Sequence, residues 1–186
     1  MSENKPAGNE GCVLLVDDEE VVRESLGGFL KGRGFEILLA DSVRNAKKVL
    51  EQGKEIEAII CDMKMPGESG LDVLRYLSEK KLRIPLLFLT GHGTLDTCQQ
   101  AVRDGAFDYI LKPVEKQDDL VFSVKRGIDK YRMEKQHDQA QADIMSMAEQ
   151  HCDILDKLLS ELETKDVVLE DLLKIVGKWK EPHAQD

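Results

Sequence analysis

Five short apolar runs along the chain alternate with segments in which apolar residues recur every three or four positions. Four of the runs are continuously apolar, as is typical of strands that are covered on both faces of a sheet. They span residues 12–18, 58–62, 85–91 and 108–113, whereas the more mixed run at 35–41 suits an edge strand. The alternation predicts five strands, each followed by a helix, around one core.

This order predicts an α/β fold of the (βα)5 type, a doubly wound parallel sheet with helices on both faces. The flavodoxin-like version of this sheet has the strand order 2-1-3-4-5. Gly34, Gly53 and Gly105 stand near the ends of three helical segments, where a left-handed C-terminal cap favours glycine. Ligands bind such sheets beyond the carboxyl ends of the strands, so we expect the functional residues there.

Helical periodicity resumes after the fifth strand and continues well beyond the length that this fold needs. Residues 134–143 are polar on all sides but contain neither Gly nor Pro, which favours a solvated helix. Beyond them, residues recur in alternating steps of four and three with two polar interruptions, as in a coiled-coil seam. We therefore expect a disordered N-terminus at 1–10, a domain at 11–130 and a helical or coiled-coil extension at 131–186. The seam consists of Ile144, Ala148, His151, Leu155, Leu158, Leu162, Lys165, Leu169, Leu172, Val176 and Trp179.

Composition and charge narrow the class of function. The chain of 186 residues has 36 Asp/Glu against 26 Lys/Arg, and its net charge of −10 opposes non-specific binding to nucleic acid. No apolar run approaches a membrane span and the polar N-terminus lacks a secretory signal, so we expect a cytoplasmic protein without a membrane partner. The four cysteines lack the spacing of a metal site or a disulfide framework and are expected to be reduced and mostly buried.

Polar residues stand at the ends of four predicted strands. Asp17 and Asp18 end the first strand, Asp62 the third, Thr90 the fourth and Lys112 the fifth. Carboxylates that converge on one sheet edge repel one another unless a cation lies among them, and an all-oxygen set favours Mg²⁺ or Mn²⁺ over zinc. With a metal ion and a lysine beside it, Asp62 could act as a nucleophile and form an acyl phosphate. Each residue alone is an ordinary turn or capping residue, but their joint placement favours a site.

Four motifs together resemble the receiver domain of two-component response regulators. They are LLVDDE, CDMKMPGESGLDVL, PLLFLTGHG and AVRDGAFDYILKP, in the order and spacing of that family, and they cover residues 11–130. The last two are most similar to receivers of the nitrogen-regulation, enhancer-binding type. The resemblance implies a protein that accepts a phosphoryl group from a sensor histidine kinase or a phosphotransfer protein in a Mg²⁺-dependent reaction. It also implies that the protein is no enzyme beyond its own phosphorylation and dephosphorylation.

The resemblance assigns roles at the metal and phosphoryl site. It makes Asp62 the phosphorylated residue, and it makes Asp18 and Asp62 side-chain ligands of Mg²⁺. Asp17 would be a ligand through water and Met63 a ligand through its backbone carbonyl. The family also has a cis peptide bond before the proline that matches Pro113.

Further residues take switch roles by the same resemblance. Thr90 and Lys112 become the pair that senses the phosphoryl group. Tyr109 becomes the aromatic residue that turns inward when Thr90 moves toward the phosphoryl group. Lys64 and His92 occupy positions that modulate the lifetime of the phosphoryl group in the family.

The expected output is a change in protein contacts. Phosphorylation would alter the face formed by the fourth helix, the fifth strand and the fifth helix, which continues into the extension. No nucleotide-binding loop of the G-x-x-x-x-G-K-[ST] type occurs, so the ATPase domain expected after such a receiver is absent. Residues 115–186 carry 11 Lys/Arg against 17 Asp/Glu, a net charge of 11 − 17 = −6, which argues against DNA binding. A homodimer that contacts a downstream protein is the favoured interpretation.

Several alternatives stay open from the sequence. The extension could be a coiled coil, a helical hairpin with its turn at 163–166, or a segment that folds back on the receiver. The chain could be an N-terminal fragment of a longer transcription regulator, or a scaffold that has lost signalling. An aspartate-nucleophile phosphatase is disfavoured, because Asp62 is followed by Met63 and Lys64 rather than by a second acid two residues on.

Overall fold

Five parallel strands form the central sheet of the computed structural model, which describes residues 10–91, 103 and 105–178. The strand order β2-β1-β3-β6-β7, with parallel pairing throughout, confirms the predicted order 2-1-3-4-5 and the edge position of the mixed run. Residues 1–9 of the segment 1–10 that was expected to be disordered, together with His92 and Cys98, lie outside the described residues. The strands are β1 (Cys12–Val16), β2 (Glu36–Ala40), β3 (Ala58–Asp62), β6 (Leu86–Thr90) and β7 (Asp108–Leu111).

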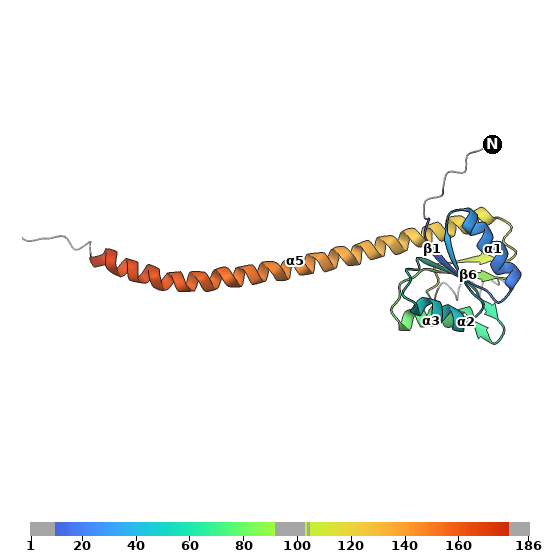
Figure 1. The fold of residues 1–186 in the computed structure, drawn as a ribbon, viewed down its shortest axis with the longest axis horizontal. Coiled ribbons are helices and arrows are strands. Elements are labelled where there is room, and N and C mark those ends of the chain that lie inside the picture. The colour runs from blue at the N-terminus through green and yellow to red at the C-terminus, as the bar shows by residue number, and fades with distance from the viewer. Residues whose placement is uncertain (1–9, 92–102, 104, 179–186) are drawn as a thin grey trace, which may run out of the picture. The chain divides into compact units, whose positions relative to one another are not determined.

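Helices cover both faces of this sheet (Figure 1). α1 (Glu20–Gly32) and the first part of α5 (Gln117–Lys178) bury Leu30 and Leu120 against one face. α2 (Val43–Glu51) and α3 (Gly70–Glu79) bury Ala46 and Val73 against the other. Side chains on a strand alternate between the faces. Since helices cover both faces, the central strands β1, β3 and β6 are apolar up to the polar residues Asp62 and Thr90 at the carboxyl ends of β3 and β6, which explains the continuous runs in the sequence.

Local sequence accounts for most helix ends. The Ser42 hydroxyl accepts the Asn45 amide at the start of α2, and Ser69 forms a reciprocal capping box with Asp72 at the start of α3. Gly34, Gly53 and Gly105 adopt positive φ angles, which agrees with the predicted left-handed caps. The two adjacent glycines in α1 have different surroundings. Gly27 packs closely against β2, whereas Gly28 faces open space.

Two features differ from the predicted elements. The run at 108–113 was expected to be buried, but β7 has only β6 as a partner in the described sheet, and its side chains are half exposed because it lies at the edge. The segment after Asp62, where the sequence analysis places no strand, contains a small antiparallel hairpin of β4 (Lys64–Met65) and β5 (Glu68–Ser69). Its short strands give no alternating pattern long enough to recognise.

The helix α5 is continuous for 62 residues. Residues 163–166 are helical, so a hairpin turn is not present there, and the domain boundary predicted at residue 130 falls within the helix. The chain divides into two compact units, Met1–Lys135 and Gln136–Asp186. In the second unit the following large apolar side chains are exposed: Ile144, Met145, Met147, Ile154, Leu155 and Leu158. Among the described residues, no helix is long and apolar enough to cross a membrane.

Candidate functional site

Three carboxylates converge where β1 and β3 end. The register pairs Val16 of β1 with Cys61 of β3, so the residues that follow them lie side by side at one sheet edge. Asp17 is fully buried, Asp62 is buried and Asp18 is partly exposed. One carboxylate oxygen from each of the three lies within 4.8 Å of the others. The structure therefore brings together the acidic residues that the strand ends predict.

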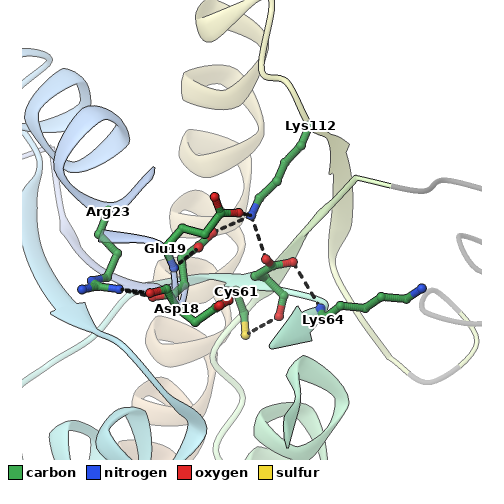
Figure 2. A network of polar contacts seen from close by, with 8 residues as sticks. Asp18, Glu19, Arg23, Cys61, Lys64 and Lys112 are labelled. Atoms are coloured by element: carbon green, nitrogen blue, oxygen red, sulfur yellow. Dashed lines mark hydrogen bonds and ion pairs between the residues drawn. The ribbon is translucent and has the colours of Figure 1, made fainter. Parts of the chain in front are cut away.

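A lysine ammonium lies between two of these carboxylates (Figure 2). Lys112 follows β7, and its Nζ donates hydrogen bonds of 2.7 Å to Asp17 Oδ2 and of 2.7 Å to Asp62 Oδ2. Its backbone N–H donates to the carbonyl oxygen of Thr90, which ties the ends of β6 and β7 together. Burial lowers the pKa of Lys112, but the hydrogen bonds to Asp17 and Asp62 and their charges outweigh burial and raise its pKa. The lysine is thus held as a cation.

The cluster keeps an excess of negative charge even with this lysine in place. Asp17, Asp18 and Asp62 contribute three carboxylates, and a fourth, Glu19, lies 4.0 Å from Lys112 Nζ. Carboxylate oxygens are the ligands that Mg²⁺ and Mn²⁺ prefer. No thiol or imidazole contributes to the three-residue cluster. The donor set found here fits the predicted divalent cation.

Asp62 is held in place by its neighbours in the chain. The Lys64 backbone N–H donates to Asp62 Oδ1 at 3.2 Å, and the Cys61 thiol donates to the Asp62 carbonyl oxygen at 3.2 Å. Burial raises the pKa of Cys61 strongly, so this sulfur stays a protonated thiol. A Cβ at Gly70 would overlap that same carbonyl oxygen, so α3 can approach the site this closely only with glycine at this position.

The backbone carbonyl of Met63, predicted as a metal ligand, already accepts two hydrogen bonds. Gly70 N–H donates to it at 3.1 Å and the Ser69 hydroxyl at 3.4 Å. A carbonyl oxygen has two lone pairs. Metal binding through this oxygen would therefore replace one of these contacts, and the longer bond from Ser69 is the weaker one.

The residues predicted to act in the switch lie along β6 and β7. Thr90 is buried at the end of β6, while Tyr109 on β7 is 38% exposed, so its ring is on the outer of its two expected positions. The Lys64 side chain extends away from the carboxylates into solvent (Figure 2). The peptide bond between Lys112 and Pro113 is cis, as the family resemblance implies.

Two residues at the site have no role predicted from the sequence. Arg23 in α1 donates from Nη1 to the carbonyl oxygens of Asp17 and Asp18 at 2.6 and 2.9 Å. Glu68 of the small hairpin accepts a hydrogen bond of 2.7 Å from the Val43 N–H, which caps α2. An arginine in the first turn of the helix that follows an acidic strand end was the only local signal for the first contact. The second has no local signal, because it joins segments 25 residues apart.

Comparisons with known proteins agree with this geometry. The family model of the response regulator receiver domain matches residues 13–125. An NtrX-like response regulator of Rickettsia bellii is 34% identical over 127 residues, which are 67% of this chain and 26% of that protein. The transcriptional regulatory protein TdiR of Thauera aromatica is 30% identical over 181 residues, 95% of this chain and 78% of TdiR. A solved receiver domain protein from Clostridium thermocellum is 32% identical with a TM-score of 0.62, over 66% of this chain and 98% of that one.

The fold, the acidic strand ends and these matches define a receiver module of the response regulator type. The chain belongs to the response regulator receiver domain family, and its relatives include NtrX-like and NtrC-type regulators. The chain spans about a quarter of the length of the NtrX-like relative.

Proposed function

We propose that this protein is a response regulator whose Asp62 accepts a phosphoryl group from a histidine kinase or a phosphotransfer protein in a Mg²⁺-dependent reaction. The observation that carries the proposal is the convergence of Asp17, Asp18, Asp62 and Lys112 at one edge of the sheet. We further propose that the protein acts in the cytoplasm and catalyses only its own phosphorylation and dephosphorylation.

The transfer step follows from the positions of these side chains. A carboxylate oxygen of Asp62 attacks the phosphorus atom of a phosphohistidine, which forms an acyl phosphate and breaks the P–N bond. The electron pair of that bond returns to the imidazole, which then takes up a proton. The Lys112 ammonium, now shared by Asp17 and Asp62, is close enough to pair with an oxygen of the incoming group.

The metal site would consist of Asp18 and Asp62 as direct ligands, Asp17 through water and the Met63 carbonyl. A bound Mg²⁺ or Mn²⁺ supplies positive charge next to the oxygens of the transferred group. Asp17 also accepts the Glu19 N–H at 2.9 Å and the Lys112 ammonium, which fixes its carboxylate in the site. Lys64 and His92 are proposed to set the lifetime of the phosphoryl group.

Phosphorylation is proposed to act as a two-state switch. The Thr90 hydroxyl would donate to a phosphoryl oxygen, and the exposed ring of Tyr109 would turn toward the space that Thr90 leaves. Residues of β7 and of the first part of α5 surround an open cavity of about 680 Å³ that includes Tyr109, Lys112 and Ser123. A movement of Tyr109 would change the lining of this cavity and therefore the surface that β7 and α5 present to partner proteins.

The output is proposed to be protein association through this face and through α5. Exposed apolar side chains such as Ile144, Leu155 and Leu158 recur along the helix in the second unit, and an isolated helix gains stability when such side chains are buried. A homodimer with a coiled-coil α5, or a complex with a downstream protein, would cover them.

Phosphorylation of the intact chain tests the proposal directly. Incubation with Mg²⁺ and acetyl phosphate should add one phosphoryl group that is stable in acid and lost in base, measured by intact mass. Asp62→Asn should abolish this adduct, while the control Glu20→Gln, an exposed acid at the start of α1, should keep it. Full labelling of Asp62→Asn would show that another residue is the acceptor.

A second output is favoured by one specific observation. TdiR, whose name describes it as a transcriptional regulatory protein, is similar to this chain over 95% of the chain's length. A transcription regulator, or a piece of a longer one, is therefore the alternative. A gel-shift assay with fragmented genomic DNA separates the two outputs, because DNA binding that requires residues 136–186 would support the alternative.

A further inference from the structure

Arg23 joins the acidic loop to α1 through two successive carbonyl oxygens. Its Nη1 lies 2.6 Å from the oxygen of Asp17 and 2.9 Å from the oxygen of Asp18. Successive carbonyl groups of a strand point to opposite sides, so two that converge on one nitrogen mark the place where the chain leaves β1. Converging carbonyl dipoles repel each other, and a guanidinium between them offsets that repulsion.

The same loop is fixed on its side-chain face by a different contact. Asp17 Oδ1 accepts the Glu19 N–H, and Asp17 Oδ2 accepts the Lys112 ammonium. Arg23 therefore holds the carbonyl groups of residues 17 and 18. The Glu19 N–H and the Lys112 ammonium hold the carboxylate of Asp17. Asp18 has no such second contact to its carboxylate among the hydrogen bonds above, so the position of its carboxylate depends on the backbone that Arg23 holds.

We propose that Arg23 is a positioning residue for the divalent-cation site, which it serves by fixing the Asp17–Asp18 backbone so that both carboxylates face the cation. This inference rests on the proposed function, because it assumes that the acidic cluster binds Mg²⁺ or Mn²⁺. Arg23 would act on cation binding through the two carbonyl groups that it holds.

The loss of Arg23 should change the affinity for Mn²⁺ in opposite directions, depending on whether Arg23 positions the carboxylates or acts only through its charge. A cation near the site repels Mn²⁺, so if charge alone mattered, Arg23→Met would strengthen Mn²⁺ binding or leave it unchanged. If Arg23 positions the carboxylates, the same change frees the loop and weakens binding in spite of the charge removed. We expect binding to weaken about tenfold, the scale on which the loss of an outer contact acts at a metal site.

The experiment is a titration of the full chain with Mn²⁺, followed by the electron paramagnetic resonance signal of the free ion, with Mg²⁺ as competitor. Arg23→Met is compared with Arg44→Met, because Arg44 is an exposed arginine that lines the same open groove as Arg23 and Asp18. Both variants remove one positive charge from this face. We expect only Arg23→Met to bind Mn²⁺ more weakly.

The conservative variant keeps the inference falsifiable if Arg23→Met does not fold. Arg23→Lys retains the charge but replaces the planar guanidinium by a single ammonium, so it should bind Mn²⁺ with an affinity between those of Arg23→Met and the wild type. Wild-type affinity in both Arg23 variants, or wild-type affinity in Arg23→Lys when Arg23→Met is unfolded, would overturn the inference. Unchanged Mn²⁺ binding after Asp18→Asn, in a chain that keeps Arg23, would instead refute the proposed metal site itself.

Discussion

Lys112 and Asp62, 50 residues apart in the chain, meet through a contact of 2.7 Å between Nζ and Oδ2. The lysine side chain is 17% exposed, the side chain of Asp62 is 10% exposed, and Asp17 shares the same ammonium from a fully buried position. The ammonium therefore offsets part of the negative charge of the carboxylates. The proposed binding of a cation and the proposed phosphorylation of Asp62 would both act on this contact.

Lys112→Met should destabilise the protein far more without divalent cations than with them. Removal of one partner of a buried ion pair leaves uncompensated charge and costs roughly 3–5 kcal/mol. Mg²⁺ at about 100 times its dissociation constant should restore roughly 2.7 kcal/mol. Urea unfolding in EDTA and in excess Mg²⁺ measures both values, with the exposed Lys64→Met as control. An unfolding free energy of Lys112→Met that does not rise in excess Mg²⁺ would show that no cation binds near Asp17 and Asp62.

The contribution of Lys112 to stability should depend on pH in the alkaline range. Its pKa is raised above the ordinary value of 10.5, so the folded state binds its proton more tightly than the unfolded state. The stabilisation is fully present below about 10.4, the unfolded value, and is lost as the pH rises through the folded pKa. The difference in unfolding free energy between wild type and Lys112→Met should be constant from about pH 7 to 9 and shrink above about pH 10.5. A difference that grows with alkaline pH would contradict the ion pair.

Gly70→Ala should displace Asp62 and lower the stability of the domain. The added Cβ would overlap the Asp62 carbonyl oxygen and lie 2.8 Å from the ring of Phe88, so overpacking should cost about 1–3 kcal/mol. Phosphorylation by acetyl phosphate should slow as well. Gly28→Ala in α1 is the matched control, because nothing lies within 4 Å of its Cβ and the change should stabilise the helix by about 0.5–1 kcal/mol. Thermal unfolding of both variants should show a lower melting temperature for Gly70→Ala and a higher one for Gly28→Ala.

The start of β1 should depend on Glu57 and α5 together. The Glu57 side chain, 13% exposed, accepts hydrogen bonds from Arg132 Nε at 2.5 Å, from Arg132 Nη2 at 3.1 Å and from the Cys12 N–H at 3.0 Å. Glu57→Gln should cost roughly 1.5–3 kcal/mol, since these bonds involve charged groups. Glu55→Gln breaks an exposed pair with Lys135 and should cost less than about 1 kcal/mol. Equal losses in denaturant unfolding would show that burial of Glu57 does not matter.

The association state should depend on the apolar side chains of α5. Leu155 and Leu158 are 58% and 50% exposed in the single chain, and burying each against a partner contributes roughly 1.5–3 kcal/mol. The double variant Leu155→Lys with Leu158→Lys should reduce the mass measured by light scattering. Ser146→Lys with Gln150→Lys adds the same charge at exposed polar positions and should leave that mass unchanged.

Phosphoryl control of association is read from the same measurement. Beryllofluoride, which mimics the phosphoryl group, should change the mass of the wild-type chain and not that of Asp62→Asn. The chain truncated after Lys135, the end of the first compact unit, separates association through the receiver from association through α5. A mass that is unchanged by beryllofluoride in both chains would refute a phosphorylation-controlled dimer.

Features carried by neighbouring residues could be predicted from the sequence. The continuous apolar runs predicted the parallel strands, because the inner positions of a strand covered on both faces are apolar, whereas the strand order came from the flavodoxin-like fold type. The strand-ending acids Asp17, Asp18 and Asp62 could be placed at one edge of the sheet, because parallel strands bring their carboxyl ends together. The extent of β7 burial could not be predicted, because its composition resembles that of a central strand while its position at the edge depends on the whole sheet.

The strands and the acids at their ends can be read from short segments of the chain, because hydrophobic period and strand polarity are local properties. How those acids are held depends on the packing of distant elements. The ammonium of Lys112 reaches Asp17 across 95 residues, Arg23 holds two carbonyl groups, and Gly70 makes room for the Asp62 carbonyl. Each of these contacts depends on the distance between elements after they pack, and no local pattern of residues specifies that distance.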